Sequence, residues 1–362
     1  MRRAVALSMP VVWSDRHHLH EPGGEFWVGV RTPGSELPER AERIRDALLE
    51  AGARFVDAEA HPDGAVLAVH DPAMVAYLAS AWKEWEAAGL TVDPGQDRVV
   101  PYVFPHPGLF SGRPPAVPAA VAARAGRFAF DTMTLIGPGT WEAARSAVDA
   151  ALTAADLVLG GAPAAYACCR PPGHHATRTC FGGSCYLNNA AAAAARLRET
   201  GGGPVAVIDV DAHHGNGTQA IFYEDPGVLV GSVHVDPGAG WFPHFLGFAA
   251  ETGAGPGGGA NRNLPLAPGA ADEEWLEAVG ALVAWARECG AQVLVVALGV
   301  DAAAGDPESP LGVTPDGFRA AGSALGALGL PTVVVQEGGY DLGAIGPLVR
   351  EALTGIEEGM RA

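Results

Sequence analysis

Residues 204–217 read PVAVIDVDAHHGNG, and this stretch decides the fold. It begins with a short run of apolar, mostly β-branched side chains and then changes to carboxylates, histidines and glycines. A strand that is apolar on both faces is typical of a parallel sheet covered by helices on both sides. Ligands bind such sheets beyond the carboxyl ends of the strands, so the polar residues after this run stand where a functional site is expected.

The same arrangement recurs along the chain. Apolar runs predict further strands at 5–12, 165–169, 228–233, 291–301 and 331–339. Segments with helical periodicity alternate with them, at 139–160, 187–199, 272–289, 315–328 and 343–357. This alternation predicts an α/β fold whose central parallel sheet is flanked by helices on both faces. Polar motifs follow four of the strands, namely RPPGHHA (170–176), DAHHGNG (211–217), DAAAGDPE (301–308) and EGGYD (337–341).

Composition narrows the class of protein. With 362 residues, of which 48% are hydrophobic and 18% charged, the chain can bury a large core. No linker divides it, and we interpret residues 1–362 as one catalytic domain. The net charge of −18, without clusters of Lys or Arg, argues against nucleic acid and favours cationic ligands. No apolar stretch reaches the roughly 18 residues of a membrane span. Five cysteines are not a disulfide framework, so we expect a cytoplasmic protein.

Residues 91–128 differ from the rest of the chain. They are rich in Pro and Gly and show little periodicity. A long loop without secondary structure in a compact domain is usually functional or an interaction arm. We therefore expect a loop insertion here.

Two of the strand ends supply a candidate metal site. The alternation of a strand would send Asp209, Asp211 and His213 to one side, and a second apolar run ends in Asp301. Grouped carboxylates at the end of a buried strand are costly unless a cation offsets them. Two carboxylates and one imidazole, with positions left for water and substrate, are a plausible catalytic zinc shell, although other divalent metals such as Fe²⁺ or Co²⁺ accept it.

These motifs carry a resemblance to a known family. RPPGHHA, FGGSCYLNNAA (181–191), DVDAHHGNGTQ (209–219), LGVD with GDP (298–307) and EGGYD resemble, in order and spacing, the signature blocks of histone-deacetylase-like hydrolases. The similarity to the acetylpolyamine amidohydrolase branch extends to SDRHHLHEPGGE (14–25), GPGTWEAA (137–144) and FPHFLGFAAETG (242–253), and so covers nearly the whole chain. It implies the arginase/deacetylase fold, with a sheet of about eight strands, and a hydrolase of linear amide bonds.

The resemblance also implies roles for individual residues. It assigns one Zn²⁺ to Asp211, His213 and Asp301, proton transfer to the tandem His174 and His175, and the developing oxyanion to Tyr340, which follows a Gly338-Gly339 elbow interpreted as flexible. Asp209 would orient the first histidine of the tandem and Asn216 the second. A structural K⁺ is implied near Asp209, Asp211, His213, Ser232 and Val233, and the insertion at 91–128 would pair two subunits into a homodimer.

The substrate is harder to predict than the chemistry. Glu308 and Glu25 match acidic entrance positions of the family, which favours a small cationic acetylated amine, most of all an acetylpolyamine. Phe242 and Ser184, the latter after Gly183, match the two facing tunnel aromatics, so the serine opens one wall. A lysine deacetylase acting on protein or peptide, and a deacylase of a specialised amide with a larger acyl group, remain alternatives.

Two further alternatives are a dinuclear manganese ureohydrolase of a similar fold and an inactive, metal-stabilised binding protein. A dinuclear manganese ureohydrolase needs extra carboxylates at the positions of Gly215 and Gly299, which argues against it. An inactive binding protein would be expected to lack part of the reacting set, which is intact here. The pair His17-His18 is interpreted as surface or entrance decoration and not as a second metal site.

Overall fold

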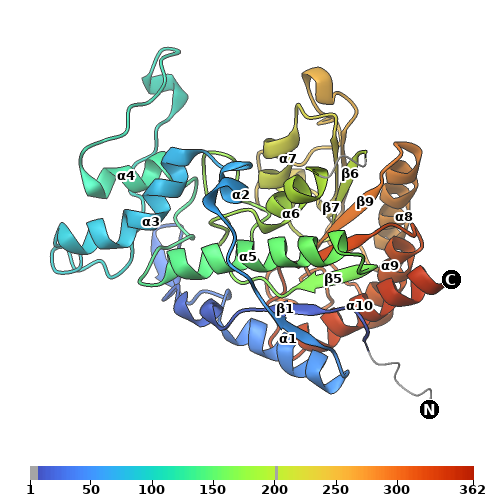
Figure 1. Ribbon diagram of the computed structural model, residues 1–362. Coiled ribbons are helices and arrows are strands. Elements are labelled where there is room, and N and C mark those ends of the chain that lie inside the picture. The colour runs from blue at the N-terminus through green and yellow to red at the C-terminus, as the bar shows by residue number, and fades with distance from the viewer. Residues whose placement is uncertain (1–6, 200–202) are drawn as a thin grey trace.

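The central element is an eight-stranded sheet in which all neighbouring strands pair in parallel. The computed structural model describes residues 7–199 and 203–362 (Figure 1). In sheet order, the strands are β4 (Phe55–Asp57), β1 (Val11–Trp13), β5 (Ala164–Ala167), β10 (Thr332–Gln336), β9 (Val293–Leu298), β6 (Val205–Asp209), β7 (Val228–Val235) and β8 (Asn261–Leu266). The predicted α/β class and the parallel sheet are thereby confirmed.

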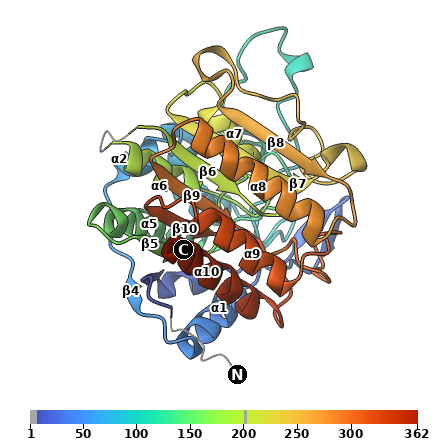
Figure 2. The same cartoon turned by 90° about the vertical axis from the view of Figure 1, so that its right-hand side faces the viewer.

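Two separate apolar clusters form the core, one on each face of the sheet. Along β6, Val205 and Val207 join one cluster while Ala206 and Ile208 join the other, because successive strand side chains point to opposite faces. One face is covered by helices α1 (Glu39–Glu50), α8 (Asp272–Glu288), α9 (Pro315–Gly326) and α10 (Ile345–Arg361) (Figure 2). The other is covered by α2 (Asp63–Leu67), α3 (Pro72–Ala87), α4 (Val121–Phe128), α5 (Thr140–Leu159), α6 (Asn189–Arg198) and α7 (Asn216–Phe222).

Each predicted helix and strand has a counterpart in the structure, although the ends differ. Each predicted helix corresponds to one of α5, α6, α8, α9 and α10, and each predicted strand to one of β1, β5, β6, β7, β9 and β10. The N-terminal prediction at 5–12 was too long, since β1 begins at Val11, and residues 5–6 lie outside the described residues. Strands β4 and β8 were not predicted, because β4 has three residues and β8, Asn261–Leu266, is partly polar.

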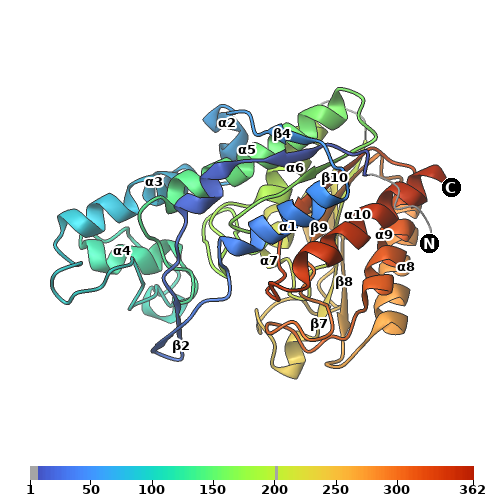
Figure 3. The same ribbon diagram turned by 90° about the horizontal axis from the view of Figure 1, so that it is seen from below.

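Two segments project beside the carboxyl edge of the sheet (Figure 3). One is the hairpin of β2 (Glu25–Trp27) and β3 (Val30–Thr32). The other is the insertion at 91–128, which is not wholly irregular as predicted, since it includes the short 3₁₀ helix η2 (Pro107–Leu109) and ends in α4. In the part of the chain that the structure describes, no helix combines the length and apolar character needed to cross a bilayer.

Candidate active site

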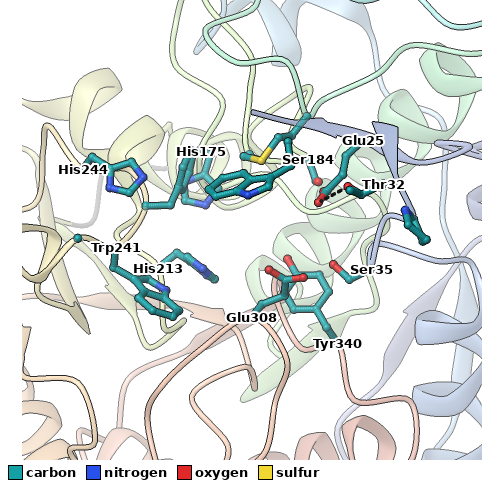
Figure 4. A pocket seen from close by; sticks show the side chains of 16 residues that line it. Glu25, Thr32, Ser35, His175, Ser184, His213, Trp241, His244, Glu308 and Tyr340 are labelled. Carbon is teal, nitrogen blue, oxygen red and sulfur yellow. Dashed lines mark hydrogen bonds between the residues drawn. The ribbon is translucent and has the colours of Figure 1, made fainter. Parts of the chain in front are cut away.

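The four polar motifs meet because their strands are neighbours. Strands β5, β10, β9 and β6 are consecutive in the sheet, so the residues after each of them emerge side by side at one edge. A cavity of about 490 Å³ opens there (Figure 4). Its walls include residues from all four strand ends and from the β2–β3 hairpin, among them Glu25, Trp27, Thr32, Met133, His175, Gly183, Ser184, His213, Trp241, Phe242, Glu308 and Tyr340.

The three predicted metal ligands lie together, and His213 among them lines this cavity. One donor atom from each of Asp211, His213 and Asp301 falls within 4.8 Å of the other two. His213 Nδ1 is 3.0 Å from an oxygen of Asp301 and 3.3 Å from one of Asp211. The path of the chain differs from the prediction, since β6 ends at Asp209. Beyond the strand, the backbone N–H of Asp211 donates to the carboxylate of Asp209, and that of His213 donates to the carboxylate of Asp211. These hydrogen bonds maintain the alternation of side chains that the prediction assigned to a strand.

The charges of this cluster fit a divalent cation. Asp211 and Asp301 are fully buried, and burial together with the neighbouring Asp211 raises the pKa of Asp301 to about 7. Burial alone would lower the pKa of His213, but hydrogen bonds to Asp211 and Asp301 outweigh it and raise that pKa well above its usual value. Two buried carboxylates beside one imidazole are stable only with compensating positive charge. Carboxylate and imidazole donors are those that Zn²⁺ accepts.

A second metal ion of the ureohydrolase kind has no room for its ligands. A Cβ atom added at Gly215 would lie 2.2 Å from a carboxylate oxygen of Asp209, and one at Gly299 would lie 2.0 Å from an oxygen of Asp211. Both separations are well inside van der Waals contact, so a carboxylate side chain at either position would require the Asp209 or Asp211 carboxylate to move. The geometry therefore agrees with the sequence argument against a dinuclear centre.

The tandem histidines have different partners and different charge preferences. The Nδ1 atom of His174 is 2.9 Å from Asp209, and that of His175 is 2.6 Å from the amide oxygen of Asn216. Burial disfavours charge on both rings, but Asp211 and Asp209 outweigh it for His174 and raise its pKa to about 10. For His175, burial and the neighbouring His174 and His213 lower the pKa well below its usual value. His175 is the one that lines the cavity.

Tyr340 is held in place by contacts that the sequence did not reveal. The guanidinium of Arg40, on α1, lies 4.6 Å from the centre of the phenol ring and donates to the carbonyl oxygens of Gly339 and Glu337. The backbone N–H of Tyr340 donates to Asp306 at 2.8 Å. The elbow of the two preceding glycines stays a prediction, but both positions require glycine, because a Cβ at Gly338 would lie 2.4 Å from Asp301 and Gly339 has a φ of +122°. Tight packing against the carboxylates of Asp301 and Asp211 thus explains Gly338.

The mouth of the cavity carries two carboxylates. Glu25 enters from β2 and Glu308 from the loop after β9, and both line the cavity with Tyr340 (Figure 4). Burial, followed by the nearby Glu308, raises the pKa of Glu25 to about 7. Phe242 also lines the cavity and packs edge-on against His175 with ring centres 4.9 Å apart. Ser184 also lines the cavity, as does Gly183, where any side chain would collide with His175.

The residues predicted around a monovalent cation are also neighbours. Asp209 and Ser232 are partners in the β6–β7 register, and Val233 follows on the same buried strand. The hydroxyl of Ser232 lies 2.8 Å from His234 Nδ1. His214, the neighbour of His213 in the sequence, is buried and lies 3.0 Å from Gln219 and 3.2 Å from Asn263. The cation site itself stays a prediction.

Three supporting residues lay outside the sequence prediction. Arg40 is one of them, and it belongs to an ordinary amphipathic helix, so nothing in the local pattern marked it. Asp131 accepts the backbone N–H of Gly183 at 2.5 Å and that of Thr134 at 2.9 Å, which holds the turn that carries Ser184. Glu337 accepts the N–H groups of Gly173 and His174 and thereby positions the first histidine. The sequence signal available for Glu337 was its place directly after an apolar strand.

Comparison with known proteins decides the family. Residues 35–356 match the family model described as the histone deacetylase domain. The chain belongs to the histone deacetylase family. Among curated members, it is 41% identical to an acetylpolyamine amidohydrolase of Mycoplana ramosa over 96% of this chain and 99% of that protein. It is 38% identical to acetylpolyamine amidohydrolase 2 of Pseudomonas aeruginosa, with 96% of this chain and 99% of that protein covered.

A solved structure gives the same result for the fold. The crystal structure of an acetylpolyamine aminohydrolase from Burkholderia pseudomallei superposes with a TM-score of 0.90 at 38% identity, and the match covers 97% of this chain and 99% of that chain. The predicted resemblance and the arginase/deacetylase fold are therefore confirmed. As a member of this histone deacetylase family, the protein is a hydrolase that acts on amide bonds.

Proposed function

We propose that this protein is a zinc-dependent amidohydrolase that removes acetyl groups from acetylated polyamines. The single observation that carries the proposal is the pairing of Glu25 and Glu308 in the same cavity as His175 and Tyr340. One end of the cavity supplies groups for amide hydrolysis and the other supplies negative charge. An acetylpolyamine has an amide at one end and an ammonium group at the other, and it matches both.

The chemistry follows from the position of each group. Zn²⁺ held by Asp211, His213 and Asp301 would polarise the amide carbonyl and make a water molecule nucleophilic at neutral pH. His175, neutral and facing the cavity, accepts the proton of that water and returns it to the departing amine. His174 is hydrogen-bonded to Asp209 and itself carries a positive charge, because its pKa is raised to about 10. The phenol of Tyr340 donates to the developing oxyanion.

The two carboxylates supply the specificity in this proposal. A hydrogen bond between a carboxylate and an ammonium group is charge-assisted, and in a partly desolvated site it is worth roughly 1.5–3 kcal/mol, or about 10- to 100-fold in discrimination. The backbone of an acetyl-lysine peptide has no ammonium group at the matching position. We therefore expect acetylputrescine, acetylcadaverine and acetylspermidine to be turned over faster than an acetyl-lysine peptide.

The test is a substrate panel with the wild type and Glu308→Leu. N-butylacetamide, which has the amide and chain of acetylputrescine but no ammonium group, is the matched substrate control. We expect Glu308→Leu to reduce kcat/KM for acetylputrescine about 10-fold or more and to spare N-butylacetamide and the peptide. Preference of the wild type for the peptide would favour the lysine deacetylase alternative. Equal losses on all three substrates would remove Glu308 from substrate recognition.

Ser184 supports the other alternative, a deacylase of a specialised amide with a larger acyl group. Its side chain, which lines the same cavity as Phe242, is much smaller than the aromatic that the resemblance leads one to expect there. Faster turnover of a butyryl amine than of the matching acetyl amine would favour a deacylase of larger acyl groups over an acetylpolyamine deacetylase.

The insertion at 91–128 is the proposed dimerisation arm of this domain. It carries Tyr102, Val103, Phe104, Leu109 and Val117 as exposed apolar side chains, and clustered exposed apolar surface is typical of a protein contact. Light scattering at micromolar concentration should give twice the mass of one chain. Replacing Tyr102 and Leu109 by Ser should shift the mass toward that of a monomer, and a monomeric wild type would contradict the proposal.

Two further parts of the proposal concern a cation and a compartment. A structural K⁺ is proposed beside Asp209, Asp211, His213, Ser232 and Val233. The cytoplasm is proposed as the compartment, because all five cysteines are free thiols, which suits a reducing environment.

A further inference from the structure

A second cluster of metal-binding side chains lies outside the active-site cavity. His17 and His18 belong to the short 3₁₀ helix η1 (Asp15–Leu19), and Glu42 belongs to α1. Their donor atoms lie within 4.8 Å of one another. The three residues are not among those that line the cavity. The interpretation of the histidine pair as surface decoration is wrong for His17, whose side chain is 3% exposed, and fits only His18, at 50%.

Both imidazoles converge on a single oxygen atom. The Nε2 atom of His17 is 3.2 Å from Oε1 of Glu42, and the Nε2 atom of His18 is 2.8 Å from the same Oε1. The other oxygen, Oε2, is held by Arg45 at 2.6 Å, so Oε1 is turned toward the histidines. The Nδ1 atom of His17 is buried without a hydrogen-bond partner. Among the described residues, Glu42 is therefore the one hydrogen-bonding partner of the buried ring of His17.

The spacing suits a transition-metal ion after a small adjustment. Ligand atoms about 2.0–2.2 Å from a tetrahedral ion lie about 3.4 Å apart. This is about 0.2 Å more than the 3.2 Å between His17 and Glu42 and about 0.6 Å more than the 2.8 Å between His18 and Glu42. His18 is half-exposed and Glu42 is 24% exposed, so both can move outward by that amount. The Nε2 atom of His17, which already faces Oε1 of Glu42, is the ring atom available as a ligand.

We propose that His17, His18 and Glu42 form a second site for a divalent transition-metal ion such as Zn²⁺, which clamps η1 to α1. Two imidazoles and one carboxylate leave the remaining coordination to water, because the cluster faces solvent through His18. Arg170, Arg45 and Arg16 lie near the cluster in the structure or sequence and oppose a metal ion, whereas Asp15, Glu36 and Asp46 favour one. The site is consequently weaker than the buried active-site cluster.

The clamp would join two segments that support the active site. The carbonyl oxygen of His17 accepts a hydrogen bond of 2.6 Å from Arg170, which begins the loop that carries the tandem histidines. Helix α1 carries Arg40, which packs on Tyr340, one half-turn before Glu42. An ion that binds only the folded chain stabilises it by mass action, so the melting temperature should rise with added metal.

The test counts ions and measures melting temperature on the full chain. After dialysis, Zn²⁺ is added stepwise, and the bound ions per chain are measured by equilibrium dialysis. The wild type should take up one ion beyond those it retains from dialysis, and its melting temperature should rise. His18→Ala and Glu42→Gln should lose that ion and that rise while they retain the tightly bound metal of the wild type. Glu39→Gln, the same charge change at an exposed position of α1, should behave as the wild type.

The outcomes separate this site from the proposed active-site metal. Uptake of the additional ion by His18→Ala and Glu42→Gln as by the wild type, or no additional uptake by the wild type, would overturn the clamp. Loss of the tightly bound metal in Asp301→Asn with the additional ion still bound would show that the two sites are independent.

Discussion

The base of the cavity and its mouth are built in different ways. At the base, Asp211, His213 and Asp301 come from the ends of neighbouring sheet strands, and each is fixed by hydrogen bonds to buried groups. At the mouth, Glu25 comes from a two-stranded hairpin and Glu308 from a loop. Their hydrogen bonds are few, with Thr32 3.5 Å from Glu25 and the backbone of Glu308 tied to Asp306.

This difference separates the chemistry of the site from its specificity. The base is constrained by the sheet itself, so a change there alters the charge balance of a buried cluster. The mouth tolerates substitution, because its side chains are partly exposed and depend on few neighbours. Changes at the base should therefore affect every substrate, whereas changes at the mouth should alter the ranking of substrates.

The largest effect is expected from the metal-ligand cluster. Asp301→Asn keeps an oxygen that can accept the N–H of Ala212 but removes a charge beside His213. We expect the variant to lose the proposed zinc and more than about 10³-fold of its activity on all amides, because a metal supplies several kcal/mol to such a reaction. Metal analysis and kcat/KM provide the measurement, and the exposed Asp316→Asn is the control. Metal content equal to the wild type would exclude Asp301 as a ligand.

A smaller but still uniform loss is expected at Tyr340. Tyr340→Phe keeps the ring that packs under Arg40 and removes only the hydroxyl. Removing one oxyanion donor typically lowers turnover by about 10²–10³. The loss should appear in kcat for the polyamine, neutral and peptide substrates alike, with metal content unchanged. Tyr102→Phe, at an exposed tyrosine, serves as the control, and near-normal turnover by the Tyr340 variant would argue against an oxyanion role.

The base could be predicted from the sequence for a physical reason. Strands β5, β6, β9 and β10 are apolar on both faces, and their polar endings are visible as abrupt changes in composition. Because parallel strands end at one edge, the four endings could be brought together without knowing the strand order. Only the detailed path was wrong, since β6 ends at Asp209 and hydrogen bonds continue the alternation.

The supporting contacts could not be predicted in the same way. Arg40 reaches Tyr340 across 300 residues of chain, from a helix whose pattern is that of any surface helix. The meeting of Glu42 with the two histidines likewise depends on how η1 packs beside α1. The strands β4 and β8 were missed because short or partly polar strands carry little periodicity. The contacts of Arg40 and Glu42 follow from tertiary packing, which the local sequence does not encode.

The smallest predicted effect is a pH dependence at the mouth. Burial and the nearby Glu308 raise the pKa of Glu25 to about 7, so its carboxyl group loses its proton as the pH rises from about 6 to 8. The ammonium group of acetylputrescine stays charged across this range, because the pKa of such an amine is near 10. Its attraction to Glu25 therefore strengthens as the pH rises. The ratio of kcat/KM for acetylputrescine to that for N-butylacetamide should increase, and the ratio cancels titrations at the base that affect both substrates.

The size of this effect is limited by solvent, because Glu25 is only partly buried. A partly exposed ion pair is worth up to about 1 kcal/mol, which corresponds to about a fivefold rise in the ratio. Glu25→Gln should flatten the ratio at its low-pH value, whereas Glu21→Gln, at an exposed position of the same segment, should leave the rise intact. A flat ratio in the wild type, or an unchanged rise in Glu25→Gln, would mean that Glu25 does not contact the ammonium group. Glu308 would then be the remaining carboxylate at the mouth to account for selection of a cationic amine.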